Sequence, residues 1–408
     1  MLILDVKGNF YKEVLSYAKS CNREDDIIVI SLNADITYNP LDKPELKPLV
    51  LANRLKTILT LFSPNTGADS YWIDKAEQVI AECIKLCRLY NNSYVNFLEI
   101  HKLISYEDYY KEKLHVLQKM FRSGTLSEEN IYNLSSSLEF FEKEFNSLDS
   151  RVLSILKSEI TRITSVFVSD YESLKIFSPE SRNFSKSLNF SDVLDSGKIA
   201  VLNLNISKYK NLSKIIAAYL KLDFQGEVLA RLSTGSITPS CFISDEYHEY
   251  VTSTDADFFA QSREAKCINI VATQSYTSLL NTLKDQSCVK VITQNLINKF
   301  WFRSDDSFTI EEAQKQIGKE DKIKTSKSIS ENSKETKFSY LTNSLKSINS
   351  SLSESISTYV HTDFTYDTKF FTQELETFSC LCFISDGEKI SPPSKIKLIP
   401  SFLKGDQS

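Results

Sequence analysis

The sequence predicts an α/β protein in which a mostly parallel sheet is flanked by helices and interrupted by a large all-helical insertion. In residues 1–65 and again in 179–318, short apolar runs alternate with segments of helical periodicity, which is the pattern of strands joined by helices. Between them, residues 66–178 show only helical periodicity, with apolar side chains three and four positions apart. We therefore expect residues 1–65 and 179–318 to form one sheet domain that contains 66–178 as an all-α domain.

The first region contains two expected strands joined by a helix. Residues 1–4 are an apolar run closed by a turn, and residues 11–18 have the periodicity of a helix. Residues 27–32 are the second apolar run, and the Asn-Pro-Leu-Asp sequence at 39–42 ends it. Because a strand, a helix and a strand in succession place both strands in the same direction, a parallel sheet is expected.

The later elements follow the same reasoning. Helical periodicity predicts helices at 72–90, 93–104, 127–134 and 138–167, with Ser127 as a candidate first cap. The strand pattern then returns at 198–204, 241–244 and 267–273, with a helix through 212–232.

The last ninety residues divide into a polar and an apolar part. Residues 319–358 are rich in Lys, Ser, Glu and Asn, which predicts a mobile or partly helical surface segment. Residues 370–384 are apolar and aromatic, so we expect 359–408 to return to the sheet domain with a final strand.

Composition limits the classes of function that the chain can have. With 408 residues, of which 41% are apolar, the chain can bury a full core. A net charge of −5 means that any contact with nucleic acid depends on a local basic surface or on a ring of subunits. The eight cysteines lack zinc-site spacing and are expected to be reduced cytosolic thiols. No apolar run approaches the roughly 18 residues of a membrane-spanning helix, so we expect the chain as given to be cytoplasmic.

An acid pair ends one of the expected strands. The apolar run at 241–244 is followed by Asp245 and Glu246, at the end of a parallel strand where ligands bind in open sheets. An Asp there can hold Mg²⁺ through water, and a neighbouring Glu can orient or deprotonate the attacking water in phosphoryl transfer. An exposed acid pair at the start of a loop is the alternative.

Two further residues follow the acid pair at suggestive positions. Gln274 ends the next expected strand and can hydrogen-bond a γ-phosphate, and Arg263 on the preceding loop can reach a phosphate in a neighbouring subunit. Each has a structural alternative, a helix-flanking amide and a surface arginine, but together with the acids they favour nucleotide hydrolysis. Lys7 follows the first strand and could neutralise a phosphate or cap its loop.

The chain has no glycine-rich phosphate loop, which needs two glycines five residues apart followed by Lys and Ser or Thr. Its glycines stand at positions 8, 67, 124, 197, 226, 235, 318, 387 and 405. The four histidines fit no metal or nucleophile pattern, and His248 is expected to be a solvated loop residue. The aromatic residues Tyr276, Phe300, Trp301 and Phe302 could stack bases, although core packing is the more common role of such residues beside strands.

In order along the chain, several segments resemble the type IV coupling proteins, the TraG, TraD and VirD4 group of DNA-pumping ATPases in conjugation and type IV secretion. These segments are MLILDVKGNF at 1–10, NPLD at 39–42, YWIDKAEQVI at 71–80, GKIAVLNLNI at 197–206, CFISDEYHEY at 241–250, SREAKCINIVATQSY ending at Tyr276, and NKFWFRSDD at 298–306. The resemblance implies a RecA-like, P-loop NTPase fold. It spans nearly the whole chain outside 319–358.

The resemblance also implies roles for individual residues. Asp245 and Glu246 match the Walker B pair, with Asp245 holding Mg²⁺ through water, Arg263 matches the arginine finger, and Gln274 matches the γ-phosphate sensor. Lys7 is the other candidate for nucleotide contact. ATP and Mg²⁺ are the implied cofactors, and the implied setting is a homo-hexamer at the cytoplasmic face of the inner membrane. Its implied partners are DNA, relaxosome proteins such as those recognised through TraM, and the secretion channel.

The family pattern includes an amino-terminal membrane anchor and a Walker A loop ahead of the segment that matches MLILD. We therefore expect this chain to correspond to the carboxyl-terminal portion of a coupling protein and to be inactive by itself. One alternative is a non-catalytic module that recruits DNA or the relaxosome. Another is a DNA pump of the FtsK or HerA kind, which the long helical block after NPLD disfavours.

Overall fold

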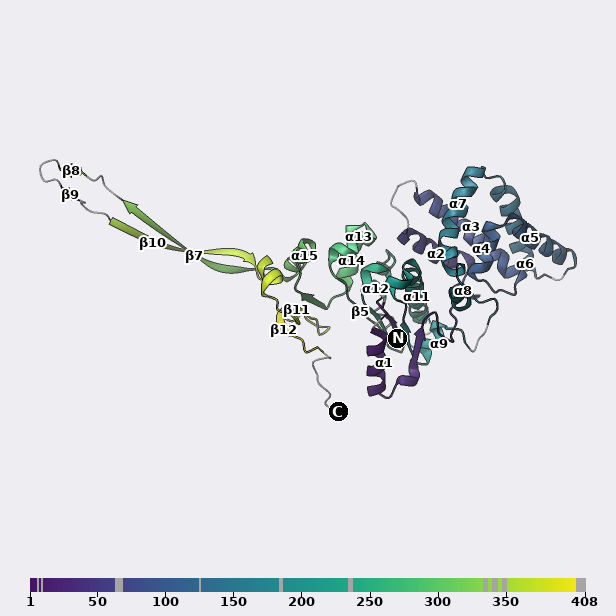
Figure 1. Cartoon of the computed structure of the whole chain (residues 1–408), viewed down its shortest axis with the longest axis horizontal. Helices are drawn as coiled ribbons and strands as arrows, with labels where there is room; N and C mark the ends of the chain where they lie inside the picture. Colours follow the sequence, from purple (N-terminus) through teal and green to yellow (C-terminus); the bar gives the residue numbers. More distant parts are fainter. Residues whose placement is uncertain are drawn as a thin grey trace. The chain divides into compact units, whose positions relative to one another are not determined.

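The computed structural model describes residues 1–5, 7–8, 10–62, 69–124, 126–182, 186–233, 238–332, 337–339, 344–346 and 351–400. The chain divides into two compact units, Met1–Leu296 and Ile297–Ser408, called unit 1 and unit 2 below. Figure 1 shows the elements of both units along the chain.

A five-stranded sheet forms the centre of unit 1. Its strands are β1 (Leu2–Leu4), β2 (Ile27–Ile30), β3 (Ile199–Leu202), β4 (Ser240–Ser244) and β5 (Cys267–Val271), in the order β2-β3-β1-β4-β5. Every neighbouring pair is parallel, which confirms the predicted fold class of a parallel sheet with flanking helices. The first strand of the chain is central because β1 lies between β3 and β4.

Helix α1 (Phe10–Ser20) covers only part of one face of this sheet. Val14 of α1 packs on Ile3 and Val201, which lie on that face in β1 and β3. Residues opposite each other in neighbouring strands share a face, so Ile243 of β4 and Ile270 of β5 continue the same row. At edge strand β5 the row is bare, since Ile268 is 59% and Ile270 is 53% exposed. Parallel sheets are normally covered on both faces.

The other face of the sheet is covered by α11 (Asn211–Ala230) and α12 (Asp255–Gln261). Phe224 of α11 stacks on Phe242 of β4, with 6.2 Å between the ring centroids, and both side chains are fully buried. Most residues of α11 are apolar, as burial on nearly all sides requires, and its buried Lys221, Asp223 and Gln225 each have a polar partner.

The helical insertion lies between β2 and β3, which are neighbours in the sheet. Its helices are α2 (Pro48–Phe62), α3 (Asp69–Tyr90), α4 (Phe97–Ser105), α5 (Glu107–Arg122), α6 (Glu128–Glu139), η2 (Phe140–Phe145), α7 (Ser150–Val168), α8 (Tyr171–Phe177) and α9 (Phe190–Asp195). Ser127 caps α6 by accepting from the backbone N–H of Asn130, as predicted. Figure 1 shows α3 to α7 packed together as one group.

Aromatic packing joins this insertion to the sheet domain. Phe97 of α4 and Phe167 of α7 stack with 3.9 Å between ring centroids, and Tyr219 of α11 packs edge-on against both. The remaining elements of unit 1 are η1 (Glu24–Asp26), α10 (Ile206–Tyr209), η3 (Arg231–Ser233), η4 (Tyr247–Glu249), α13 (Tyr276–Leu283) and α14 (Gln286–Asn295). Among the described residues, no helix combines the length and the apolar character needed to cross a bilayer.

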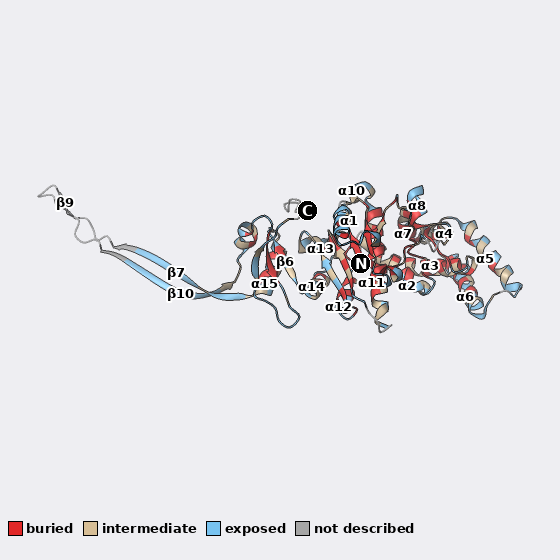
Figure 2. Cartoon of the chain, turned by 90° about the horizontal axis from the view of Figure 1, so that it is seen from below, coloured by how far each residue is buried: buried red, intermediate tan, exposed pale blue. Residues whose placement is uncertain are grey.

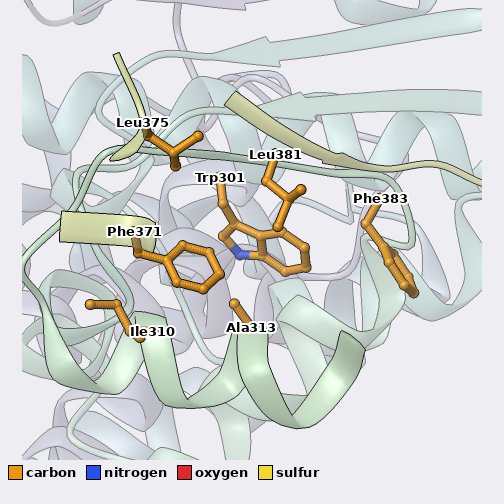
Figure 3. Packing of buried hydrophobic residues seen from close by; sticks show 7 residues of the cluster. All are labelled: Trp301, Ile310, Ala313, Phe371, Leu375, Leu381 and Phe383. Carbon is orange, nitrogen blue, oxygen red and sulfur yellow. The ribbon is translucent and has the colours of Figure 1, made fainter. Parts of the chain in front are cut away.

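Unit 2 has its own small core. An antiparallel sheet in the order β12-β11-β6 is made of β6 (Lys299–Phe302), β11 (Ser379–Phe383) and β12 (Ser394–Lys397). Helix α15 (Ser307–Ile317) and η5 (Phe370–Glu374) pack on it around Trp301, as Figure 3 shows. Trp301 is therefore a core residue, whereas Phe300 and Phe302 are each 50% exposed on the opposite face of β6.

Two sequence-based expectations differ from this arrangement. The apolar strand within 370–384 pairs with β6 and β12 instead of returning to the five-stranded sheet. Segment 319–358, expected to be mobile or partly helical, contains a long two-stranded antiparallel ribbon of β7 (Lys319–Asn332) and β10 (Ser351–Phe364). A short pair, β8 (Lys337–Ser339) and β9 (Ser344–Lys346), lies between them in the chain. The polar composition concealed an alternating pattern of β-branched residues that suits a strand.

Candidate functional site

Side chains from three neighbouring strands meet at the carboxyl edge of the five-stranded sheet. Lys7 follows β1, Asp245 and Glu246 follow β4, and Gln274 follows β5. Lys7 Nζ forms an ion pair with Glu246 and lies 3.8 Å from Asp245 Oδ2. Gln274 Nε2 donates to both carboxylate oxygens of Glu246, at 3.3 and 3.2 Å. Four of the five candidate site residues are thus adjacent in space.

The backbone of the acid pair is held from both sides. Asp245 donates its N–H to the carbonyl of Leu4 in β1, and Tyr247 donates to the carbonyl of Ala272 after β5. Between them, Glu246 adopts the left-handed conformation with φ 46° and ψ 45°. A residue other than glycine rarely adopts this conformation unless its surroundings impose it. The turn aims the Glu246 side chain at Lys7 and Gln274.

A buried polar network supports this turn from behind. Tyr250 donates its hydroxyl to the carbonyl of Asp245 at 2.6 Å, and Tyr247 donates to Asp255 Oδ2 at 2.5 Å. Asp255 also accepts from Lys221 Nζ at 2.6 Å and from Gln225 Nε2 at 2.9 Å. Lys221 and Asp255 have no exposed surface. Thr252 Oγ1 accepts from Lys221 Nζ at 2.9 Å, and we call the group of Lys221, Gln225, Tyr247, Thr252 and Asp255 the Lys221–Asp255 network.

The two acids differ in their surroundings. Partial burial opposes ionisation of Glu246, but hydrogen bonds from Lys7 and Gln274 outweigh it and lower the pKa of that carboxyl. The same bond to Glu246 raises the pKa of Lys7. The Glu246 side chain is 11% exposed and that of Asp245 is 40% exposed. Glu246 is therefore a fixed, charged carboxylate, while Asp245 is open to a hydrated cation.

The loop after β1 positions Lys7. The fully buried carboxylate of Asp5 accepts from the backbone N–H groups of Lys7 and Phe10, at 2.8 and 2.7 Å. Asn205 donates to the carbonyl of Lys7 at 2.7 Å. Of the two roles open to Lys7 in the sequence, the loop is capped by Asp5, and the lysine side chain faces the acid pair.

Sequence reasoning missed one neighbour of the site. His248 was expected to be solvated, but its side chain is only 15% exposed, and Nδ1 lies 3.6 Å from Glu246 Oε2. Thr273 Oγ1 lies 3.2 Å from the same nitrogen. His248 follows the acid pair closely in sequence, but no periodicity distinguishes an inward-facing residue in a turn.

Arg263 is separated from the other four residues within one chain. It is exposed in the turn between α12 and β5, just before the amino end of β5. The carboxyl ends of β4 and β5 carry Glu246 and Gln274, so Arg263 lies at the opposite edge of the sheet. The single constellation suggested by the sequence is therefore divided between two edges.

The residues present suit magnesium held mostly by water and phosphate. In the described part of the chain no three His, Cys, Asp or Glu side chains form a protein-only metal cage. Magnesium at nucleotide sites commonly uses one or two carboxylates and keeps several waters. Asp245, with its open carboxylate beside Glu246, fits that kind of site.

Comparisons with known proteins bear on the fold. No family model matches the chain, and no curated protein matches it. Its structure is similar to that of the bacterial conjugative coupling protein TrwBdeltaN70 in its unbound monoclinic form, with a TM-score of 0.62 and 10% identity over 98% of this chain and 77% of that one. The chain has the fold of a type IV coupling protein.

Two further structures of this coupling protein are similar to the chain. The complex of plasmid coupling protein TrwB with a non-hydrolysable GTP analogue gives a TM-score of 0.62 at 11% identity, over 98% of this chain and 78% of that one. The complex with ADP and Mg²⁺ gives 0.60 at 9% identity, over 98% and 84%. The coupling-protein fold inferred from the sequence is confirmed, while the roles of individual residues remain proposals.

Proposed function

We propose that this chain is the Walker B and sensor portion of an ATP-driven DNA translocase of the conjugative coupling type. The observation that carries the proposal is the meeting of Asp245, Glu246, Gln274 and Lys7 at the carboxyl edge of a parallel sheet. Ligands bind at that edge in open α/β sheets. The coupling-protein fold, seen in complexes with nucleotides and Mg²⁺, supports the same conclusion.

Each residue has a defined part in this proposal. Glu246 orients and deprotonates the attacking water, since it is a fixed and charged carboxylate in contact with an amide donor. Gln274 reports the state of the γ-phosphate to Glu246 through their hydrogen bonds. Asp245 holds Mg²⁺ through water, and the metal supplies charge neutralisation when bound. Lys7 must leave Glu246 for the base to act, and its released ammonium group can then pair with a phosphate.

The phosphate-holding loop is proposed to come from a polypeptide segment outside these 408 residues. The bare row at Ile268 and Ile270, next to the free edge of β5, offers a place for one more parallel strand and a covering helix. The junction of such a strand and helix would lie at the carboxyl edge beside Gln274. Amide groups at the start of a helix bind phosphates.

Arg263 is proposed to act on a neighbouring subunit, because its own chain holds it at the far edge of the sheet. Such a finger needs a ring, and the family suggests a homo-hexamer at the cytoplasmic face of the inner membrane. DNA, relaxosome proteins and the secretion channel are the proposed partners. The all-α domain, 66–178, is proposed to contact them, as in TraM recognition.

A second candidate is a non-catalytic module that recruits DNA or the relaxosome. The absence of a phosphate loop from the sequence favours it, and it needs only the helical insertion with its well-buried core. The two candidate functions differ in whether they require the Glu246 carboxylate. Recruitment does not depend on the charge of that carboxylate.

The test is a chimera that extends the chain at its amino end by a strand, a glycine-rich Lys-Ser loop and a helix. We expect Mg²⁺-dependent ATP hydrolysis, stimulated by DNA, that Glu246→Gln lowers at least a hundredfold, as loss of a general base does. Glu249→Gln, an exchange at a neighbouring acid, is the matched control and should retain activity. A folded chimera that binds nucleotide but hydrolyses it equally well with Glu246→Gln contradicts the proposal. One that binds DNA and never nucleotide favours the recruiting module.

A further inference from the structure

The β7–β10 ribbon has two chemically different faces. On one face, Ile323 lies opposite Val360, Thr325 opposite Thr358, and Lys327 opposite Ile356. On the other, serines face each other, and the hydroxyl oxygens of Ser328 and Ser355 are 3.0 Å apart. We call the residues Ile323, Thr325, Ile329, Ile356, Thr358 and Val360 the apolar strip.

The apolar strip is exposed in the single chain. Ile323 is 72%, Val360 66%, Ile356 64% and Ile329 62% exposed. Figure 2 shows the described residues of the ribbon as exposed over most of its length. An isolated two-stranded ribbon is marginally stable in water and needs a third strand or a packing surface. A strip of this kind marks an interaction site.

Charge indicates what covers the strip. Strands β7 and β10 contain four lysines and five acids, namely Lys319, Lys322, Lys324, Lys327, Glu320, Asp321, Glu331, Glu354 and Asp363. This balance disfavours a polyanion such as DNA or an anionic membrane as the partner, because binding to either depends on excess positive charge.

The strip is complementary to itself. Asp321 lies on its face near one end, and the ion pair of Lys327 with Glu354 lies on the same face toward the other. Two copies packed face to face in opposite directions bring the Lys327–Glu354 pair of each toward Asp321 of the other, which places Lys327 between two carboxylates. The same packing covers the isoleucines and Val360 of both copies. Isologous contacts of this kind close on themselves about a two-fold axis.

We infer that the apolar strip is a self-association surface, through which the ribbons of two copies of this chain pack face to face and antiparallel. The inference is independent of the proposed function, because it uses no residue of the nucleotide site. In an assembly it would join chains through unit 2.

The first test compares charges placed on the two faces. Val360→Lys puts a charge into the strip, and Ser357→Lys puts the same charge on the serine face of the same strand as the matched control. Sedimentation of the intact chain over a range of concentrations should show a dimer. Val360→Lys should lower the association constant of this dimer at least tenfold, and Ser357→Lys should leave it unchanged. Circular dichroism of both variants checks that strand content is retained.

The second test uses a milder exchange. Thr358→Cys, near the middle of the strip, should give a covalent dimer with a short bismaleimide, above the background of the native cysteines, while Ser357→Cys should not. A monomer at every concentration overturns the inference. So does association that Val360→Lys leaves intact and Thr358→Cys fails to cross-link, which would mean contact through another surface. Equal cross-linking by the two cysteine variants overturns it as well.

Discussion

Removing the charge of Lys221 tests how the acid-pair turn is held. Lys221 has no exposed surface, and its ammonium group donates to Asp255 at 2.6 Å, to the carbonyl of Tyr250 at 2.9 Å and to Thr252 at 2.9 Å. Burial lowers the pKa of Lys221, because removing its charge from water costs free energy. The buried ion pair of Lys221 and Asp255 therefore differs from an ion pair on the surface. In Lys221→Met, the Asp255 carboxylate stays buried without its counter-ion.

Breaking a buried pair from one side costs about 3–5 kcal/mol, because it leaves an uncompensated charge. Asp255 would retain its bonds from Tyr247, Gln225 and the backbone N–H of Thr252, so we expect the lower part of this range. Removing both partners with apolar residues should cost clearly less than Lys221→Met alone, since no charge is then left buried.

The assay is urea unfolding followed by circular dichroism, with the transition of unit 1 separated from that of unit 2. Lys214→Met is the matched control, because Lys214 lies on the same helix as Lys221 but is 31% exposed in its ion pair with Glu249 of η4. A surface pair of this kind contributes about 0–1 kcal/mol. A loss below about 1 kcal/mol for Lys221→Met, equal to the control, would refute the argument that the network holds the turn.

Three other outcomes are expected. The chain alone should show no saturable binding of a fluorescent ATP analogue with Mg²⁺ at micromolar concentrations, because it lacks a phosphate loop, and clear saturation would contradict this. In rings of the extended protein, Arg263→Ala subunits and Glu246→Gln subunits should each be inactive alone and should regain DNA-stimulated ATP hydrolysis when mixed. An arginine finger that acts on a neighbouring subunit changes turnover by about 10³–10⁵. Mixed rings that assemble but do not hydrolyse ATP would show that Arg263 is a surface residue. Burial lowers the pKa of Lys299 to about 8. Between this pH and the ordinary pKa of lysine, the unfolded state therefore holds a proton that the folded state has released. The free energy of unfolding of unit 2 should rise with pH across that window, and Lys299→Met should stabilise unit 2 near neutral pH by on the order of 1–3 kcal/mol. Lys397→Met, at an exposed position, is the control and should not stabilise it. Equal effects of the two substitutions would show that Lys299 is not desolvated.

The sequence by itself determined the parallel sheet, the helical insertion and the position of the acid pair. Each of these depends on periodicity along the chain, which reports whether a residue faces a core or solvent. Asp245 and Glu246 follow a buried run, and Gln274 follows the next one, so their place at strand ends was readable without knowing the strand order. The cap at Ser127 was equally local.

Tertiary structure alone decided which of these residues meet. Lys7 contacts Glu246 because β1 lies beside β4, a neighbour relation that no local pattern contains. Arg263 lies on the far edge because β5 runs parallel to β4, so residues before and after the strand are separated by its length. The two faces of the ribbon likewise depend on tertiary structure. Alternating Thr, Ile and Ser form one apolar and one polar face only when β7 and β10 pair in register.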